Sequence, residues 1–295
     1  PLPEAFPTPV INAYEEGEIE PGVTLFNING RWNNDYPMVS TPENFSPAII
    51  VDDMGEIIWY YLPEDFRVHD VRPWGSEGNL VIEVWAPAAW GGKVEIDMLG
   101  NIKRRWHFTG TAENIAEGSI PVETDSYHHD YSELPNGNIL LLSSENRVIE
   151  NWYTSETDPN APRADQNVIG DVIIEMTLEG EVIREWKIHD ILDINRIGYN
   201  SLRKNYWANH YQYADYVDTE TYGPVNDWSH GNAIIYEPKD HSFIMSVPYQ
   251  DAVIKVDMDT GELVWILGNH DNWVEPSSLI NSPFSQIFLS PVQMV

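Results

Sequence analysis

The sequence predicts an all-β fold, a β-propeller built from four-stranded antiparallel blades. The prediction depends on a hairpin pattern that recurs along the chain, on alternating apolar and polar residues, and on 12 Trp and 15 Tyr in 295 residues. Tryptophan and tyrosine are enriched in strands. A supersecondary unit that recurs at intervals of tens of residues is typical of propellers and solenoids. We therefore expect a single β-propeller domain over residues 1–295.

The first repeated unit is a hairpin that closes on a tryptophan. It consists of an alternating strand, a turn with glycine and a second strand. Its copies lie at 49–59, 94–106, 172–186 and 253–265. Glycine suits the turn because it adopts positive φ without steric cost, and the alternation lets each strand bury one face.

A second hairpin, which begins at a histidine, precedes three of these copies. It runs from His69, from His129 and from His230 to another turn and an apolar strand. Two hairpins make a four-stranded blade whose first strand is innermost. We therefore expect the three histidines at equivalent inner positions of about four blades, of which the first is incomplete in its pattern.

Two insertions and the chain end complete this organisation. The insertions lie at about 145–170 and 187–226, and the second is expected to contain a short helix near Ile188. Long insertions in repeat proteins often form loops on the binding face. The tail from Asn269 to Val295 resembles the beginning of a further blade, so we expect the domain to be incomplete at its C-terminal end.

The composition excludes several classes of function. A net charge of −31 argues against nucleic acid or an anionic membrane surface as partner. The absence of cysteine excludes disulfides, a thiolate nucleophile and cysteine-ligated zinc. No apolar run approaches the roughly 20 residues of a membrane span. The acidic balance suits a surface kept soluble in a salty or extracellular setting, and a chain that begins Pro1-Leu2-Pro3 without Met suggests a processed or excised form.

Two polar clusters are the candidate site, His128-His129-Asp130 and the segment 227–232, which contains His230 and Asn232. Buried clusters of imidazole, amide and carboxylate groups are costly unless a ligand or mutual hydrogen bonds satisfy them. Adjacent residues of a strand point to opposite faces, so only one of His128 and His129 is expected to face the channel, and register favours His129. We assign His69 to a structural role.

Other chemistries fit less well. Three histidines with nearby aspartates could hold a metal ion, because imidazole is a common ligand. No short metal motif such as H-E-x-x-H occurs, however, and we assign no metal ligand. The sequence also lacks a G-x-S-x-G elbow, a phosphate-binding loop and a dinucleotide fingerprint, which disfavours serine hydrolases and nucleotide enzymes. We expect no cofactor.

At these residues the chain resembles the bacterial arylsulfate sulfotransferases that need no nucleotide cofactor. The matching segments are Pro1-Leu2-Pro3, 21–26, 127–130, 134–140, 227–232, 250–257 and 265–273. The resemblance implies a six-bladed periplasmic or extracellular propeller, with about four blades covered here. It also implies transfer of a sulfuryl group from an aryl sulfate donor to a phenolic acceptor through a sulfohistidine, in which imidazole is the nucleophile.

The same resemblance implies roles for individual residues. His129, or its neighbour His128, would exchange the proton of the phenol. His230 and Asn232 would hold the sulfuryl oxygens. Trp228 and Tyr249 are candidates to line the phenol pocket, although aromatic residues in strands more often belong to the core.

The sequence departs from the family pattern at two points. Pro248 stands where the family has an arginine that pairs with the sulfuryl group, and proline supplies neither charge nor an N–H. The nucleophilic histidine of the family lies beyond the stretch covered here, one blade past Trp265, and His270 is not in its place.

Two alternatives to a sulfotransferase therefore stay open, a non-catalytic extracellular propeller acting as a binding or assembly module, and a metal-dependent propeller enzyme. The sequence also leaves a homo-oligomer open. If the substrate is an aryl sulfate, we expect an electropositive channel within the acidic surface, because an anion must be attracted locally.

Overall fold

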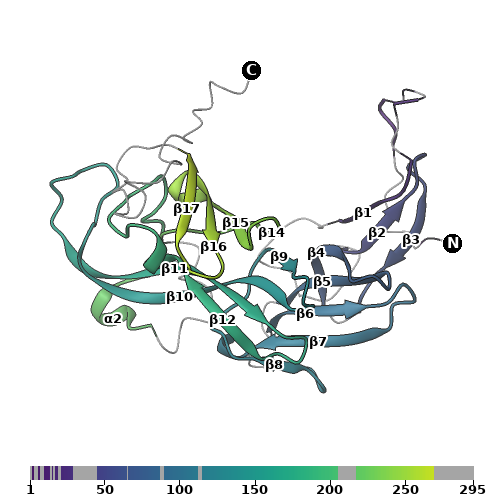
Figure 1. Cartoon of the computed structure of the whole chain (residues 1–295), viewed down its shortest axis with the longest axis horizontal. Helices are drawn as coiled ribbons and strands as arrows, with labels where there is room; N and C mark the ends of the chain where they lie inside the picture. Colours follow the sequence, from purple (N-terminus) through teal and green to yellow (C-terminus); the bar gives the residue numbers. More distant parts are fainter. Residues whose placement is uncertain are drawn as a thin grey trace. The chain divides into compact units, whose positions relative to one another are not determined.

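The computed structural model describes residues 2, 6, 10–13, 15, 17–18, 21–28, 45–64, 66–86, 90–111, 115–204 and 217–268. Its strands form four sheets in which antiparallel neighbours follow one another in chain order (Figure 1). The predicted further blade at Asn269–Val295, with His270, lies outside the described residues. The predicted fold class is confirmed: the protein is all-β, and its antiparallel sheets are blades of a β-propeller.

The chain divides into two compact units, and the first comprises Pro1–His107 and Ala112–Pro121. Two sheets belong mainly to this unit. The three-stranded sheet consists of β1 (Thr24–Asn27), β2 (Ala48–Val51) and β3 (Ile57–Tyr61), and the five-stranded sheet consists of β4 (Arg67–Trp74), β5 (Asn79–Ala86), β6 (Trp90–Ile96), β7 (Ile102–Phe108) and β8 (Ile120–Val122). Apolar side chains from both sheets, among them Ala48, Val68 and Ile82, share one core.

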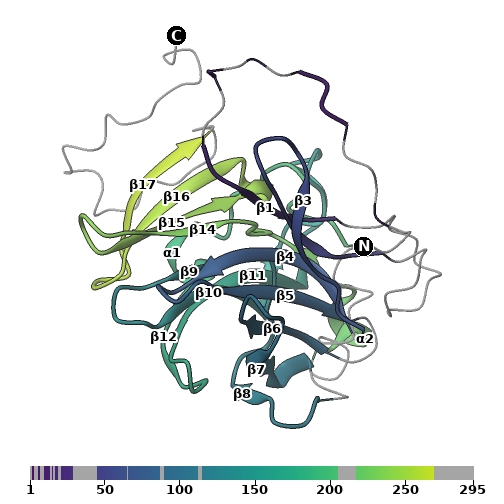
Figure 2. The ribbon, with the colours of Figure 1, turned by 90° about the vertical axis from the view of Figure 1, so that its right-hand side faces the viewer.

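The second unit comprises Phe108–Thr111 and Val122–Val295. One of its sheets contains β9 (Tyr131–Glu133), β10 (Ile139–Trp152), β11 (Ala164–Met176) and β12 (Val182–Lys187), with β13 (Asn226–Asp227) parallel to β11. The other contains β14 (Ile234–Glu237), β15 (Ser242–Val247), β16 (Ala252–Asp257) and β17 (Leu263–Gly268), which lie side by side in Figure 2. Both sheets share a core that includes Leu140, Ile173, Trp228, Phe243 and Ile254.

The glycine turns explain why the outer hairpins repeat. The turn glycine of each copy has positive φ, and its N–H donates to the carbonyl three residues earlier at Gly55, Gly100 and Gly180. The fourth, Gly261, has φ 75° and donates instead to Asp257, four residues earlier. In the last inner hairpin His241 takes the left-handed position with φ 52°. The four outer hairpins predicted from the sequence are therefore present as β2–β3, β6–β7, β11–β12 and β16–β17.

The two insertions adopt different structures. The first is not a loop but an extension of β10 and β11, which are 14 and 13 residues long and stay paired from Ile139↔Met176 to Trp152↔Ala164 (Figure 1). The second contains α1 (Ile188–Ile191), close to where the sequence predicts a helix, and α2 (Thr219–Tyr222). No helix in the described ranges is long and apolar enough to cross a membrane.

The buried side chain of Asp130 and the half-buried side chain of Ser132 join the two sheets of the second unit. Asp130 accepts the N–H of Tyr131 at 2.7 Å with Oδ1 and the N–H of Ile234 at 2.9 Å with Oδ2. The hydroxyl of Ser132 accepts the N–H of Tyr236 at 3.1 Å. These bonds bring the histidine turn before β9 and the histidine turn before β14 into one place.

Candidate functional site

His128 and His129 lie in the turn that leads into β9, not in the strand. His129 has φ 54°, in the left-handed region that residues other than glycine seldom adopt. The rule that neighbours point to opposite faces therefore does not apply here, and the expectation that only one of the two faces the channel stays a prediction without that support. The two imidazoles meet edge to face at 5.4 Å, and their Nδ1 atoms are 3.2 Å apart.

Two acceptors lie beside the other nitrogen of His128. Its Nε2 lies 3.1 Å from the carbonyl oxygen of Ser143 and 3.2 Å from Oδ1 of Asp171. Burial by itself would raise the pKa of Asp171, but the hydrogen bond and charge of His128, together with Ser229 and the N–H of Gly231, lower that pKa below its usual value. The buried carboxylate is therefore ionised.

His230 occupies the corresponding turn before β14 and also has positive φ, 55°. Its Nδ1 lies 2.6 Å from Oδ2 of Asp227, a carboxylate that is almost completely buried. The His129 and His230 rings are 6.0 Å apart, with 69° between their planes. The second unit thus brings together two of the histidines that the sequence analysis selected, and His230 lies beside a carboxylate.

Tyr249 packs flat against His230, with ring centroids 4.4 Å apart and 9° between the planes. Its hydroxyl accepts a hydrogen bond of 2.8 Å from Nη1 of Arg203, an exposed residue whose backbone pairs with Asp227. Burial and the negative charge of Asp227 raise the pKa of Tyr249, although Arg203 opposes them. Tyr249, which the sequence analysis selected, therefore lies beside the histidine pair, and its hydroxyl is hydrogen-bonded to the guanidinium of Arg203.

The structure places Trp228 elsewhere. Its side chain has no exposed surface, its Nε1 donates to the carbonyl oxygen of Arg196 at 2.9 Å, and its ring stacks on His189 at 5.6 Å. The prediction that Trp228 lines a substrate pocket is therefore wrong, because the side chain fills the core of the second unit. Asn232 is exposed, and its amide, oriented to satisfy its neighbours, donates to the carbonyls of His230 and Gly231 at 3.0 Å.

His69 belongs to the first unit and differs from the other two histidines. It lies within β4, at the register shift between Val68 and Asp70, rather than in a turn ahead of a strand. Its Nδ1 is 3.1 Å from Oε2 of Glu83, and that hydrogen bond is the largest cause that raises the pKa of His69. The expected equivalence of the three histidines therefore holds for His129 and His230 alone.

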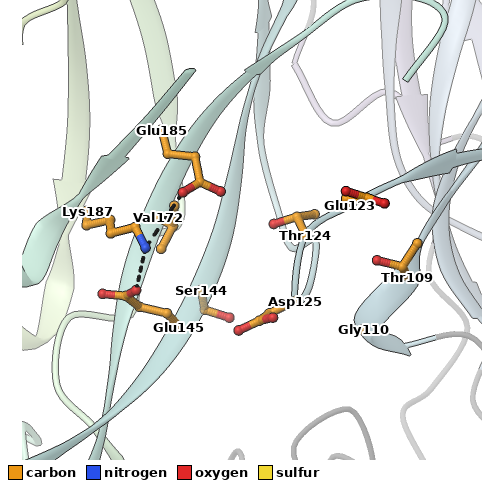
Figure 3. A pocket seen from close by; sticks show the side chains of 10 residues that line it. All are labelled: Thr109, Gly110, Glu123, Thr124, Asp125, Ser144, Glu145, Val172, Glu185 and Lys187. Carbon is orange, nitrogen blue, oxygen red and sulfur yellow. Dashed lines mark hydrogen bonds and ion pairs between the residues drawn. The ribbon is translucent and has the colours of Figure 1, made fainter. Parts of the chain in front are cut away.

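A cavity of about 450 Å³ opens beside the segment that leads into the His128 turn (Figure 3). It is lined by Thr109, Gly110, Glu123, Thr124, Asp125, Ser144, Glu145, Val172, Glu185 and Lys187. Its lining includes four carboxylates and one ammonium group, and Lys187 pairs with two of them, Glu145 and Glu185. This cavity is therefore not the electropositive channel expected for an anionic substrate. In the described part of the chain, no three His, Asp or Glu side chains are grouped so as to hold a metal ion.

Asp171 and Arg203 are the site residues that the sequence analysis missed. A signal for Asp171 was present, because a carboxylate in the apolar run 168–174 must have buried partners. Arg203 has no such signal, since it lies in the second insertion, outside any repeat.

The fold and the site define a β-propeller with a paired-histidine site. The profile of the arylsulfotransferase (ASST) family matches residues 15–293, and the chain belongs to that family. It is 25% identical over 255 residues to the arylsulfate sulfotransferase AssT of Escherichia coli O6:H1, which covers 80% of this chain and 39% of that protein. It is also 25% identical over 192 residues to AssT of Lelliottia amnigena, which covers 61% and 28%.

The chain thus spans 39% of the length of the first of these relatives. Among solved structures, a streptogramin B lyase covers 85% of this chain and 60% of its own, with 11% identity and a TM-score of 0.37. Hydrazine synthase of Kuenenia stuttgartiensis has 15% identity and the same TM-score of 0.37, over 72% of this chain and 46% of its own. Similarities this weak add nothing on function.

Proposed function

We propose that the chain forms part of the active site of an arylsulfate sulfotransferase, in which His129 handles the phenol proton and His230 faces the sulfuryl group. The observation that carries the proposal is the 6.0 Å approach of the His129 and His230 rings, each ring ordered by polar contacts, in a member of the ASST family. Imidazoles held in this way are suited to proton transfer near neutral pH.

The proposed reaction has two steps. A histidine nucleophile attacks the sulfur of the donor, so that an N–S bond forms while the S–O bond to the first phenol breaks; protonated His129 gives that leaving oxygen its proton. The acceptor phenol then gives its proton to His129 and attacks sulfur, and the N–S bond breaks. Following the family resemblance, we assign the nucleophile to a histidine outside residues 1–295.

Charge on the sulfuryl oxygens must be balanced by donors arranged around them. Arg203 supports this part of the proposal, because it brings an exposed guanidinium to Tyr249, the ring that stacks on His230. We propose that Arg203 supplies the positive charge that Pro248 cannot, and that the Tyr249 ring forms a wall of the aryl pocket. The role of Asn232 toward the sulfuryl group stays a prediction.

A second candidate is a non-catalytic propeller that acts as a binding or assembly module. Pro248 favours it, since this residue begins a 3₁₀ turn, Pro248–Gln250, and its side chain offers no donor. In either case we propose a periplasmic or extracellular location, in keeping with the net charge of −31 and the family resemblance. Self-association stays open.

The test uses the whole protein with an aryl sulfate donor, a phenol acceptor and no added metal. We expect release of the donor phenol, sulfation of the acceptor, and a mass increase of one sulfuryl group on the protein when the acceptor is omitted. If neither phenol release nor the mass increase occurs, the sulfotransferase proposal fails and the non-catalytic module is left. Loss of activity on chelation would instead favour a metal-dependent enzyme.

Two variants probe the assigned roles. His129→Ala should lower turnover by about 10²–10⁴-fold, the usual contribution of a general acid–base. The loss of turnover should be larger for donors whose leaving phenolate is more basic, because such a poor leaving group depends most on receiving a proton. Arg203→Ala should raise KM by about tenfold, the value of one charge-assisted hydrogen bond. Lys239→Ala is the control, since Lys239 is an exposed cation in the turn after β14.

A further inference from the structure

Asp171 is a buried carboxylate that the proposed chemistry does not yet use. It lies in β11 with 3% of its surface exposed. Its Oδ1 is 3.2 Å from Nε2 of His128. Its Oδ2 accepts hydrogen bonds from the hydroxyl of Ser229 and, at 2.8 Å, from the N–H of Gly231. One side chain thus contacts both histidine turns of the site.

We infer that Asp171, His128 and His129 form a proton relay, in which Asp171 is the positioning residue that determines which nitrogen of His129 takes up a proton. The inference rests on the proposed function for its role in turnover. The arrangement of hydrogens that it requires follows from the described contacts.

The acceptors around His128 determine its tautomer. Oδ1 of Asp171 and the carbonyl of Ser143 can only accept, so Nε2 of His128 carries the hydrogen. In neutral His128 the lone pair is then on Nδ1. Nδ1 of His129 lies 3.2 Å away, so beside neutral His128 it must be the donor in this contact. The hydrogen of neutral His129 is therefore on Nδ1, and its basic lone pair is on Nε2.

This arrangement conserves protons through the reaction. When the acceptor phenol gives its proton to Nε2 of His129, the hydrogen on Nδ1 can pass to Nδ1 of His128. The positive charge then lies on His128, beside the carboxylate of Asp171, which stays ionised throughout. When a leaving phenolate takes the proton back, both transfers reverse. A carboxylate that orients an imidazole and stabilises its charged form acts in the same way in other histidine catalysts.

A purely structural role for Asp171 is the competing interpretation, because the carboxylate also ties the turn 229–231 to β11. The two roles separate in Asp171→Asn. The N–H of Gly231 requires an acceptor at the Oδ2 position, so the amide oxygen must stay there and the NH2 group must face His128. Nε2 of His128 then becomes an acceptor, the hydrogen moves to Nδ1, and His129 is left with its hydrogen on Nε2.

The experiment is ¹⁵N NMR of the histidine side chains in the whole protein. In the wild type we expect the hydrogen of His128 on Nε2 and that of His129 on Nδ1. In Asp171→Asn both should move to the other nitrogen while the unfolding midpoint stays close to the wild type. Ser229→Ala is the matched control, since it removes the hydrogen bonds of the Ser229 hydroxyl with the carboxylate and the N–H of Asp171 and leaves the contact with His128. Both tautomers should stay as in the wild type.

If the hydrogen of His128 is found on Nδ1 in the wild-type protein, the relay is overturned. This measurement uses the wild type alone, so it does not depend on whether any variant folds. An Asp171→Asn protein with unchanged tautomers would also overturn the relay. For turnover we expect Asp171→Asn to lower kcat by about 10²–10⁴-fold with little change in KM, as when a triad carboxylate is replaced by its amide. If the tautomers are as expected but no phenol is released, the proposed arrangement of hydrogens stands and only the proposed function is contradicted.

Discussion

The ring of Tyr249 lies parallel to that of His230 at 4.4 Å, while its hydroxyl accepts a hydrogen bond from Arg203. The Tyr249 side chain therefore has two contacts: its ring face packs on the His230 imidazole, and its hydroxyl binds the Arg203 guanidinium. Stacking stabilises a pair of aromatic rings by about 0.5–1.5 kcal/mol beyond simple burial. The two contributions can be separated because phenylalanine retains the face and removes the hydroxyl.

Replacing Tyr249 tests this division. Tyr249→Phe should retain most of the turnover and raise KM by a few fold, because Arg203 loses its anchor. Tyr249→Ala should lower the free energy of unfolding by about 3 kcal/mol, since a buried ring is lost, and should also lower kcat. Urea unfolding and initial rates measure both. If Phe is as harmful to kcat as Ala, the hydroxyl rather than the ring is what the site needs.

Trp228→Phe tests the placement of Trp228 in the core. The variant loses the hydrogen bond from Nε1 to Arg196 and some of the stacking on His189, so the free energy of unfolding should fall by about 1–3 kcal/mol. KM for the aryl sulfate should be unchanged, because the side chain is fully buried. A KM that rises without loss of stability would return Trp228 to the substrate pocket.

Gly231→Ala tests how tightly the turn packs on Asp171. A Cβ atom at this position would lie 2.8 Å from Cε of Met245 and 3.0 Å from Oδ1 of Asp171. The methionine can move, but the carboxylate is held on both oxygens, so the free energy of unfolding should fall by about 1–3 kcal/mol. Gly137→Asn is the control: Gly137 has φ +84° with open space around it, and asparagine tolerates that backbone, so the loss should be below about 1 kcal/mol.

Glu145 should make the second unit sensitive to acid. Its carboxylate lies 3.0 Å from Nζ of Lys187, 2.6 Å from Nη2 of Arg147 and 3.2 Å from Nδ1 of His189. Burial would raise the pKa of Glu145, but the hydrogen bonds of His189 and Lys187 and the charge of Arg147 lower it from 4.5 to about 2. A pKa below the unfolded value adds stability above pH 4.5, which is lost as the pH falls toward 2.

Glu145→Gln should therefore lower the free energy of unfolding at neutral pH by about 1–3 kcal/mol, allowing for solvent screening. The difference from the wild type should shrink as the pH falls from 4.5 toward 2. Urea unfolding over this range measures it. Glu179→Gln, an equal change of charge at an exposed turn residue, is the control. A difference between wild type and Glu145→Gln that stays constant with pH would contradict the assignment.

The repeats made the sheets predictable because each hairpin is specified locally. The alternation at 172–186 and its turn at Gly180 predict β11 and β12 without reference to the rest of the chain. The length of β10 could not be predicted in this way. Its second half has exposed or half-buried residues where an inner blade strand would be apolar, and this pattern is typical of a loop as much as of a projecting hairpin.

The site was only partly predictable, since its geometry depends on backbone conformations and distant contacts. Nothing in the sequence indicates that His129 and His230 adopt positive φ, which is what turns the His129 ring onto His128. Asp171 meets both histidine turns only after two sheets have packed. The aromatic character of Trp228 and Tyr249 was correctly noted, but their fates differ because one fills the core and the other stacks on an imidazole.

The bond from the N–H of Ile234 to Asp130 closes a loop of 104 residues, and the neighbouring bond from Tyr236 to Ser132 spans the same distance. Contacts this remote in sequence form late in folding, because the entropy of the long loop must be lost before they stabilise anything. The His128–His129 turn is synthesised well before the strand that holds it in place. The proposed site therefore depends on the packing of two sheets, and hydrogen exchange at the Ile234 amide should report their joint opening rather than local fraying.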